Sequence, residues 1–203
     1  MTFKHALIPV VLCLLLLWII QTVSYLHLFS TLNWGIQPLN PSSLTGIFTA
    51  PLVHTSWQHV MANSLPLLVL GTALRLGYPK SWFIVLTVVW LGSGLGVWLF
   101  ARPLSHVGAS GLTHGFMFFI FVAGIRRKDK PSTALAMIVF FMYGGMVLSI
   151  LPQDATISFE YHFFGALMGI LSALLLWSRD PISSAPQYDW ENEDDEVPVN
   201  REE

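Results

Sequence analysis

Acidic residues are nearly absent from the first 179 residues of this 203-residue chain. Only Asp129, Asp154 and Glu160 occur there, and the remaining carboxylates lie at or beyond Asp180. Because no apolar segment carries a carboxylate at its centre, a transporter coupled to protons or cations is disfavoured. The chain also lacks a His-Glu-x-x-His motif and an Asp within an apolar segment, which disfavours metalloproteases and aspartyl intramembrane proteases.

Cysteine and charge are equally scarce. The single cysteine, Cys13, excludes an intramolecular disulfide and is interpreted as a small apolar filler. Charged residues make up 11% of the chain and hydrophobic residues 54%, a balance that soluble domains of this length rarely show. The lipid bilayer is therefore the expected surrounding, and we expect no metal, cofactor or nucleic acid to bind.

Six apolar segments are long enough to be considered as membrane spans. They predict an all-α polytopic membrane protein with six helices in one domain, at Ala6–Leu28, His59–Leu76, Trp82–Phe100, Ser110–Ile125, Thr133–Leu151 and Ser158–Trp177. No small-x-small cleavage site follows the first segment, so it is interpreted as a retained anchor and not as a signal peptide.

Basic residues predict the orientation, because short cytoplasmic loops collect Lys and Arg. They gather at 75–80 and 126–130, with Lys4 before the first span and Arg179 after the last, whereas the opposite side has only Arg102. Both termini are expected in the cytoplasm, with the protein in a bacterial inner membrane.

Two segments differ from the spans in composition. Residues 29–58 mix aromatic and aliphatic residues with Pro and Ser, so they are expected to form an interfacial loop of a membrane domain over 1–179. Residues 180–203 are acidic and poor in apolar residues, so they are expected to form a disordered cytoplasmic tail.

Polar residues recur near the outer starts of three helices. His59 and Asn63 open one predicted helix, Ser110 opens a second and His162 opens a third. In the predicted topology these positions lie at a similar depth on one side of the membrane. Polar groups are costly in hydrocarbon unless they face a bundle interior or a watery cavity, so their coincidence indicates one site.

Ser110 is the candidate nucleophile. It follows Gly108 and Ala109 and precedes Gly111, a small-residue turn into a helix start where free backbone N–H groups stabilise a developing oxyanion. The predicted helix is shorter than the hydrocarbon core, so its outer end is expected below the outer surface, under a cavity that water could fill.

His162 is the candidate base, since a serine needs one to act as a nucleophile. Gly165 and Gly169 share its helix face, and the helix that begins with the serine carries an equivalent stripe at Gly111 and Gly115. Two such faces let backbones approach closely. The imidazole and the serine hydroxyl are therefore expected within reach of each other.

Each histidine also has a simpler interpretation. His162 could be a packing residue, and His114, one turn after the serine, could compete as base, although its deeper position favours a stacking role. His59 and Asn63 could donate to an oxyanion or could merely tie their helix to the preceding loop. For His54 a structural hydrogen bond is expected. Glu160 is expected to point away from the site and is not taken as a third catalytic member.

At these residues the sequence resembles the rhomboid family of intramembrane serine proteases. The resemblance is carried by His54, His59 and Asn63 (H-x4-H-x3-N), by Gly108, Ser110 and Gly111 (G-x-S-G), and by His162, Gly165 and Gly169 (H-x2-G-x3-G). It implies a Ser110–His162 dyad without an acidic member. It also implies an oxyanion site formed by His59, Asn63, Gly108 and the Ser110 amide.

The resemblance further implies that the substrates are single-span transmembrane proteins cut near their outer boundary. Three positions depart from the family pattern: Thr45-Gly46 replaces a Trp-Arg pair, Tyr161 stands where a small residue is common, and His114 stands where an aromatic is expected. The alternative function is a catalytically inactive rhomboid-like protein that binds membrane clients.

Overall fold

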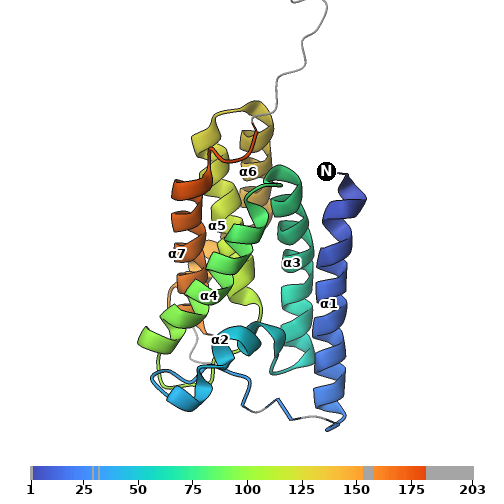
Figure 1. The fold of residues 1–203 in the computed structure, drawn as a ribbon, viewed down its shortest axis with the longest axis vertical. Helices are drawn as coiled ribbons and strands as arrows, with labels where there is room; N and C mark the ends of the chain where they lie inside the picture. Colours follow the sequence, from blue (N-terminus) through green and yellow to red (C-terminus); the bar gives the residue numbers. More distant parts are fainter. Residues whose placement is uncertain (1, 29, 32, 153–157, 182–203) are drawn as a thin grey trace, which may run out of the picture.

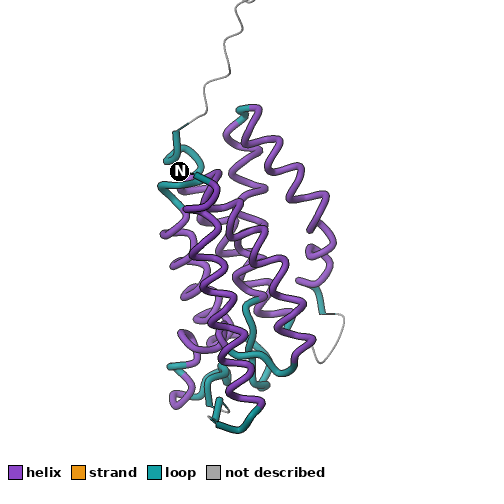
Figure 2. The backbone as a smooth tube through the Cα atoms, turned by 90° about the vertical axis from the view of Figure 1, so that its right-hand side faces the viewer, coloured by secondary structure: helices purple, strands orange, loops and turns teal. Residues whose placement is uncertain are grey.

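In the computed structural model, residues 2–28, 30–31, 33–152 and 158–181 are described. The chain is all-helical there, apart from one isolated bridge between Ile36 and His106. The long α-helices run roughly along one axis (Figures 1 and 2). Their bounds are α1 Phe3–Tyr25, α2 Gly46–Thr49, α3 Trp57–Gly77, α4 Trp82–Phe100, α5 Ser110–Arg127, α6 Lys130–Tyr143 and α7 Phe159–Leu176, and the 3-10 helices are η1 Pro41–Ser43, η2 Ala50–Leu52 and η3 Gly144–Ile150.

Five helical segments are long and apolar enough to cross a membrane: α1, α3, α4, the combined α6 and η3, and α7. The chain is thus an integral, multi-pass membrane protein. α5 is not among the five, because His114, Thr113 and the closing arginine pair lower its hydropathy.

Helix ends differ from the predicted ones where a capping group decides them. α3 begins at Trp57, before the predicted His59, because the Ser56 side chain accepts a hydrogen bond from the His59 N–H at 3.1 Å. The predicted span Thr133–Leu151 corresponds to one candidate span, Lys130–Ile150, which consists of α6 followed by the seven-residue η3. The change to the tighter helix falls at the Gly144-Gly145 pair, where helical propensity is low.

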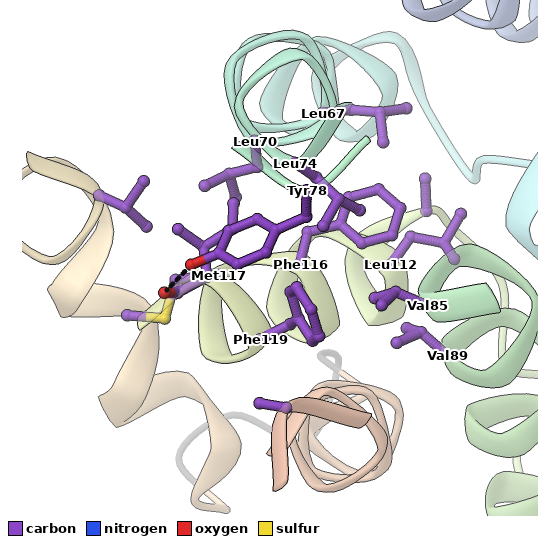
Figure 3. Close-up of a cluster of buried hydrophobic side chains, with 14 of the residues drawn as sticks. Leu67, Leu70, Leu74, Tyr78, Val85, Val89, Leu112, Phe116, Met117 and Phe119 are labelled. Atoms are coloured by element: carbon purple, nitrogen blue, oxygen red, sulfur yellow. Dashed lines mark hydrogen bonds between the residues drawn. The ribbon is translucent and has the colours of Figure 1, made fainter. Parts of the chain in front are cut away.

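α5 lies at the centre of the bundle and packs against α3, α4, α6 and α7. Its inner half contributes Phe116, Met117, Phe119 and Ile120 to the hydrophobic core (Figure 3). Tyr78, at the end of α3, lies over this cluster and its ring contacts Phe119 edge-on. The long helix that is not among the five candidate spans is therefore the most enclosed one.

α1 lies at the edge of the bundle, against α3 (Figure 1). Leu12, Leu15 and Ile19 of α1 and Phe141 of α6 are exposed, as expected of surfaces that face lipid.

The segment predicted as an interfacial loop contains η1, α2 and η2, and α2 packs against α4. Thr49 donates to Trp34 O at 2.8 Å, and Gly46 packs so closely that a Cβ would lie 2.5 Å from Gly35 O. This backbone contact gives a physical reason for a glycine at 46, where a larger residue is expected. Phe48 is exposed on α2.

The start of the predicted tail is held to the bundle. Asp180 is 2% exposed and accepts a hydrogen bond from the Lys80 N–H at 2.6 Å, while Arg127 donates to the carbonyls of Asp180 and Pro181. These bonds hold Asp180 and Pro181, the first two residues of the predicted tail, against the bundle. Residues 182–203, the rest of the predicted tail, lie outside the described part.

Candidate active site

Ser110 is the first residue of α5, as predicted. The chain enters the helix through Gly108, whose φ of 110° is a conformation that favours glycine. A Cβ at Gly108 would lie 2.7 Å from the His59 ring, so a larger residue would displace that imidazole. Gly108 also donates its N–H to Ala50 O at 2.9 Å, which ties the turn to η2.

His54 supports this turn through the structural hydrogen bond expected from the sequence. The Ala109 N–H donates to His54 Nε2 at 3.4 Å, and the two imidazoles of His54 and His59 meet edge to face at 4.9 Å. Burial, with a smaller contribution from His59, lowers the pKa of His54 to about 3. The ring is therefore neutral at physiological pH and can accept this backbone bond.

Glycine stripes bring α5 and α7 together at backbone distance. A Cβ at Gly165 would lie 2.2 Å from Gly111 O, and one at Gly169 would lie 2.2 Å from Gly115 O. The predicted close approach is thus confirmed. Because both stripes begin next to the candidate residues, the contact sets the distance between the starts of the two helices.

One cavity of about 400 Å³ joins the predicted residues at the end of the bundle where α3, α5 and α7 begin (Figure 1). Ser110, His162, His59 and Asn63 all contribute to its wall. Gly108 lies behind His59, and the other predicted residues, His54, Gly111, Gly165 and Gly169, support the site without lining it.

The imidazole of His162 is oriented by backbone. His162 Nδ1 lies 3.0 Å from Ser149 O, and because a carbonyl can only accept, Nδ1 carries the proton. Nε2 then has the lone pair that a general base needs. Within the described residues no hydrogen bond joins Ser110 Oγ to His162, a looser arrangement of a kind common in sites without substrate.

Asn63 and His59 flank the start of α5. Asn63 Nδ2 donates to His59 O at 3.0 Å, which leaves its second N–H for another acceptor. His59 Nδ1 lies 3.2 Å from Thr55 Oγ1, and its opposite edge faces Gly108. These contacts fit both interpretations of the pair, as oxyanion donors and as a tie between α3 and the loop before α5.

His114 stacks on His162, with ring centroids 4.1 Å apart and planes 10° from parallel. This is the stacking role expected from its depth. Its Nδ1 lies 2.7 Å from the carbonyl oxygen of Ser110 and its Nε2 lies 2.8 Å from Ser149 Oγ. Both nitrogens are therefore engaged away from the Ser110 hydroxyl, which argues against His114 as the base.

Glu160 points away from the dyad, as expected. Its carboxylate receives two side-chain hydrogen bonds from Arg102, at 2.5 Å and 3.2 Å, and one from the Arg102 N–H. This pair joins the loop after α4 to the first turn of α7. Among the described residues, no group of three or more His, Cys, Asp or Glu side chains could hold a metal ion.

The sequence did not single out the remaining polar residues of the wall. Thr55, Thr113, Ser158 and Ser149 all line the cavity or bond to residues that do. Ser149 stands in an otherwise apolar run, and a lone serine there usually bonds to its own helix, so no pattern indicated its contact with two histidines.

The fold and the site define a polytopic membrane protein with a serine and a histidine facing one cavity. Residues 41–179 match the model of the rhomboid domain, which is more than half of the chain. The chain belongs to the rhomboid family.

The curated relatives are bacterial. Uncharacterized proteins of Mycobacterium bovis and Mycobacterium tuberculosis are 36% identical over 151 residues, which is 70% of this chain and 63% of each relative. The chain thus spans less than two thirds of their length. A more distant similarity, 27% over 136 residues, covers 64% of this chain and 65% of a Bacillus subtilis protein named "Putative rhomboid protease YdcA".

Proposed function

We propose that this protein is an intramembrane serine endopeptidase that uses Ser110 as nucleophile and His162 as base. The observation that carries the proposal is the cavity that both residues line. Ser110 begins α5 and His162 lies on α7, two helices in backbone contact, and Nε2 of the imidazole is unprotonated. Membership of the rhomboid family supports the same chemistry.

The proposed reaction begins when His162 Nε2 takes the proton of the Ser110 hydroxyl while its oxygen bonds to the scissile carbonyl carbon. The carbonyl oxygen becomes an oxyanion, and the N–H groups at the start of α5 stabilise it together with Asn63 and His59. His162 then gives its proton to the leaving amine. Water, activated by the same imidazole, hydrolyses the acyl-serine.

The bundle supports a membrane-embedded position for this reaction. α5 has 18 residues, and at ~1.5 Å per residue it is shorter than the ~30 Å hydrocarbon core. Enclosed by four other helices, it serves as a sixth span in our proposal. With Arg126 and Arg127 at the inner surface, Ser110 then lies below the outer one.

The proposed substrates are single-span transmembrane proteins, cut near their outer boundary after a small residue. A scissile carbonyl must leave its helical hydrogen bond before Ser110 reaches it, so Gly or Pro in the substrate helix should favour cleavage. The small residues around Ser110 leave limited room beside the nucleophile. Replacing such helix-weakening residues with Leu should slow cleavage.

Covalent labelling tests the proposal most directly. The full chain in liposomes is treated with a fluorophosphonate probe and compared with Ser110→Ala, His162→Ala and the double variant. The parent should be labelled at Ser110 and should cleave a single-span substrate. Each single variant should lose cleavage, and the double variant should be no worse, because nucleophile and base act as one unit.

The alternative, a catalytically inactive client-binding protein, predicts the opposite result. A folded parent that retains a single-span protein but is neither labelled nor able to cleave it would favour that alternative. If His162→Ala retained cleavage and His114→Ala lost it, the base would be His114.

A further inference from the structure

Ser149, in η3, contacts both histidines of the stacked pair. Its hydroxyl lies 2.8 Å from His114 Nε2, and its carbonyl oxygen lies 3.0 Å from His162 Nδ1. His114 Nδ1 in turn lies 2.7 Å from the carbonyl of Ser110. A connected path of hydrogen bonds therefore runs from the backbone of the nucleophile through His114 and Ser149 to the base.

The acceptors along this path determine where the protons lie. Because the carbonyls of Ser110 and Ser149 can only accept, His114 and His162 both carry their proton on Nδ1. The unprotonated Nε2 of His114, 2.8 Å from Ser149 Oγ, is then able to accept the hydroxyl proton of Ser149. Met146 O, 2.8 Å from the same hydroxyl, is the alternative acceptor within η3, so His114 competes with the turn for this bond.

The hydroxyl bond also holds a weakly packed turn. No residue of η3 is buried, and a Cβ at Gly145 would meet nothing within 4 Å. His114, by contrast, is buried on the central helix α5. A bond from Ser149 to that ring therefore fixes the turn, and with it the carbonyl that orients His162.

We propose that Ser149 and His114 are positioning residues, which hold the His162 imidazole with Nδ1 protonated and Nε2 directed to the cavity. This inference rests on the proposed function. Serine hydrolases commonly use a third group to orient the base. Here a backbone carbonyl, held in place by its own side chain, does so without adding a negative charge to the bilayer.

Two variants and one control test the proposal in the full chain in detergent micelles. The rate of fluorophosphonate labelling at Ser110 is measured against probe concentration, which separates the maximal rate kinact from the half-saturating concentration KI. Ser149→Ala should lower kinact by ~10–10²-fold with KI nearly unchanged, because a small misplacement of a catalytic group has effects of this size. Ser149→Thr, which restores the hydroxyl, should recover most of kinact.

Thr87→Ala is the matched control, since it deletes a hydroxyl that bonds within its own helix on α4. His114→Phe keeps a stacked ring but loses both hydrogen bonds, so it should lower kinact as Ser149→Ala does. A Ser149→Ala protein that folds and is labelled at the parent's kinact would overturn the proposal.

Nitrogen-15 NMR of His162 measures which ring nitrogen carries the proton, and this measurement does not depend on catalysis. The parent should show a protonated Nδ1, and Ser149→Ala should show a mixture of both tautomers. Unchanged His162 signals in Ser149→Ala would contradict the positioning role. If the parent were not labelled at all, the proposed function would fail, yet the NMR comparison would still decide whether Ser149 orients the ring.

Discussion

At the scale of single residues, the site depends on which ring nitrogen of each histidine carries the proton. Backbone groups decide this at three positions: a carbonyl faces Nδ1 of His162 and of His114, and an N–H faces Nε2 of His54. All three rings therefore carry Nδ1–H when neutral. Since backbone positions follow from the fold, the chemistry of the imidazoles follows from the packing of the helices.

Acid should destabilise the protein in part through His54. Its pKa in the folded state, about 3, lies below the ordinary value near 6.5. As pH falls from ~6.5 to ~3, the unfolded chain binds a proton here that the folded chain does not, so stability decreases across that window. Thermal unfolding in detergent between pH 7.5 and 4 should show a steeper loss for the parent than for His54→Gln. Equal slopes would contradict this assignment.

Asn63 should contribute to rate more than to folding. Asn63→Ala should slow cleavage by ~10²–10³-fold, the usual effect of losing one oxyanion donor, while the N–H groups of α5 remain. Cleavage of a reconstituted single-span substrate measures this. Ser64→Ala is the control, because Ser64 is next to Asn63 on α3 but bonds elsewhere, accepting from Trp18 of α1 and donating to Val60 O. If the Asn63→Ala protein cleaved as fast as the parent, Asn63 would not be an oxyanion donor, and the role of α3 would be structural.

At the scale of the elements, the contact between α5 and α7 governs the site. Each stripe presents glycine to a backbone carbonyl, so neither helix can gain a methyl group there without moving its partner. The loop before α5 is fixed as well, through Gly108 to Ala50 and through Ile36 to His106. Together these contacts fix the polar start of α5 against α7 and the preceding loops.

Gly165→Ala should therefore impair both stability and activity. Its Cβ would lie 2.2 Å from Gly111 O, and the resulting shift should cost about 1–3 kcal/mol and separate the dyad. Gly145→Ala is a matched control, because its Cβ would meet nothing within 4 Å. Thermal unfolding and Ser110 labelling measure the two effects. Similar behaviour of both variants would show that the close contact is dispensable.

At the scale of the whole molecule, the two ends of the described chain lie at the same end of the bundle. The start of α1 and the end of α7 are opposite to α2 (Figure 1). Arg127 and Lys80 bind the segment that follows α7 at that end. The basic residues also gather there, which is the distribution expected of a cytoplasmic face.

Both termini should consequently face the cytoplasm. A reporter that is active only in the cytoplasm should give a signal when fused after Glu203, and one that is active only outside should not. A fusion at Arg102 is the natural control, because the loop after α4 belongs to the other face. The reverse pattern of signals would invert the proposed topology.

Much of the site could be predicted from the sequence because its chemistry is local and repetitive. A serine in a small-residue turn at a helix start, and a histidine above a glycine stripe, indicated through their spacing where the candidate site lies. The scarcity of charged residues indicated that the chain is a membrane protein. The order and approximate bounds of the long helices follow from these patterns.

Only the tertiary structure decided which groups orient the His162 imidazole and which groups bind Asp180. Ser149 reaches two histidines from a turn remote in sequence, and Asp180 is retained by Lys80 and Arg127. The contacts of Ser149 and Asp180 join segments that are far apart in the sequence, and no local sequence pattern indicates such contacts. The sequence by itself therefore determined the membrane class, the long helices and the candidate dyad. The orientation of the His162 imidazole arose from long-range packing, because a hydrogen bond needs two groups that only the folded chain brings together.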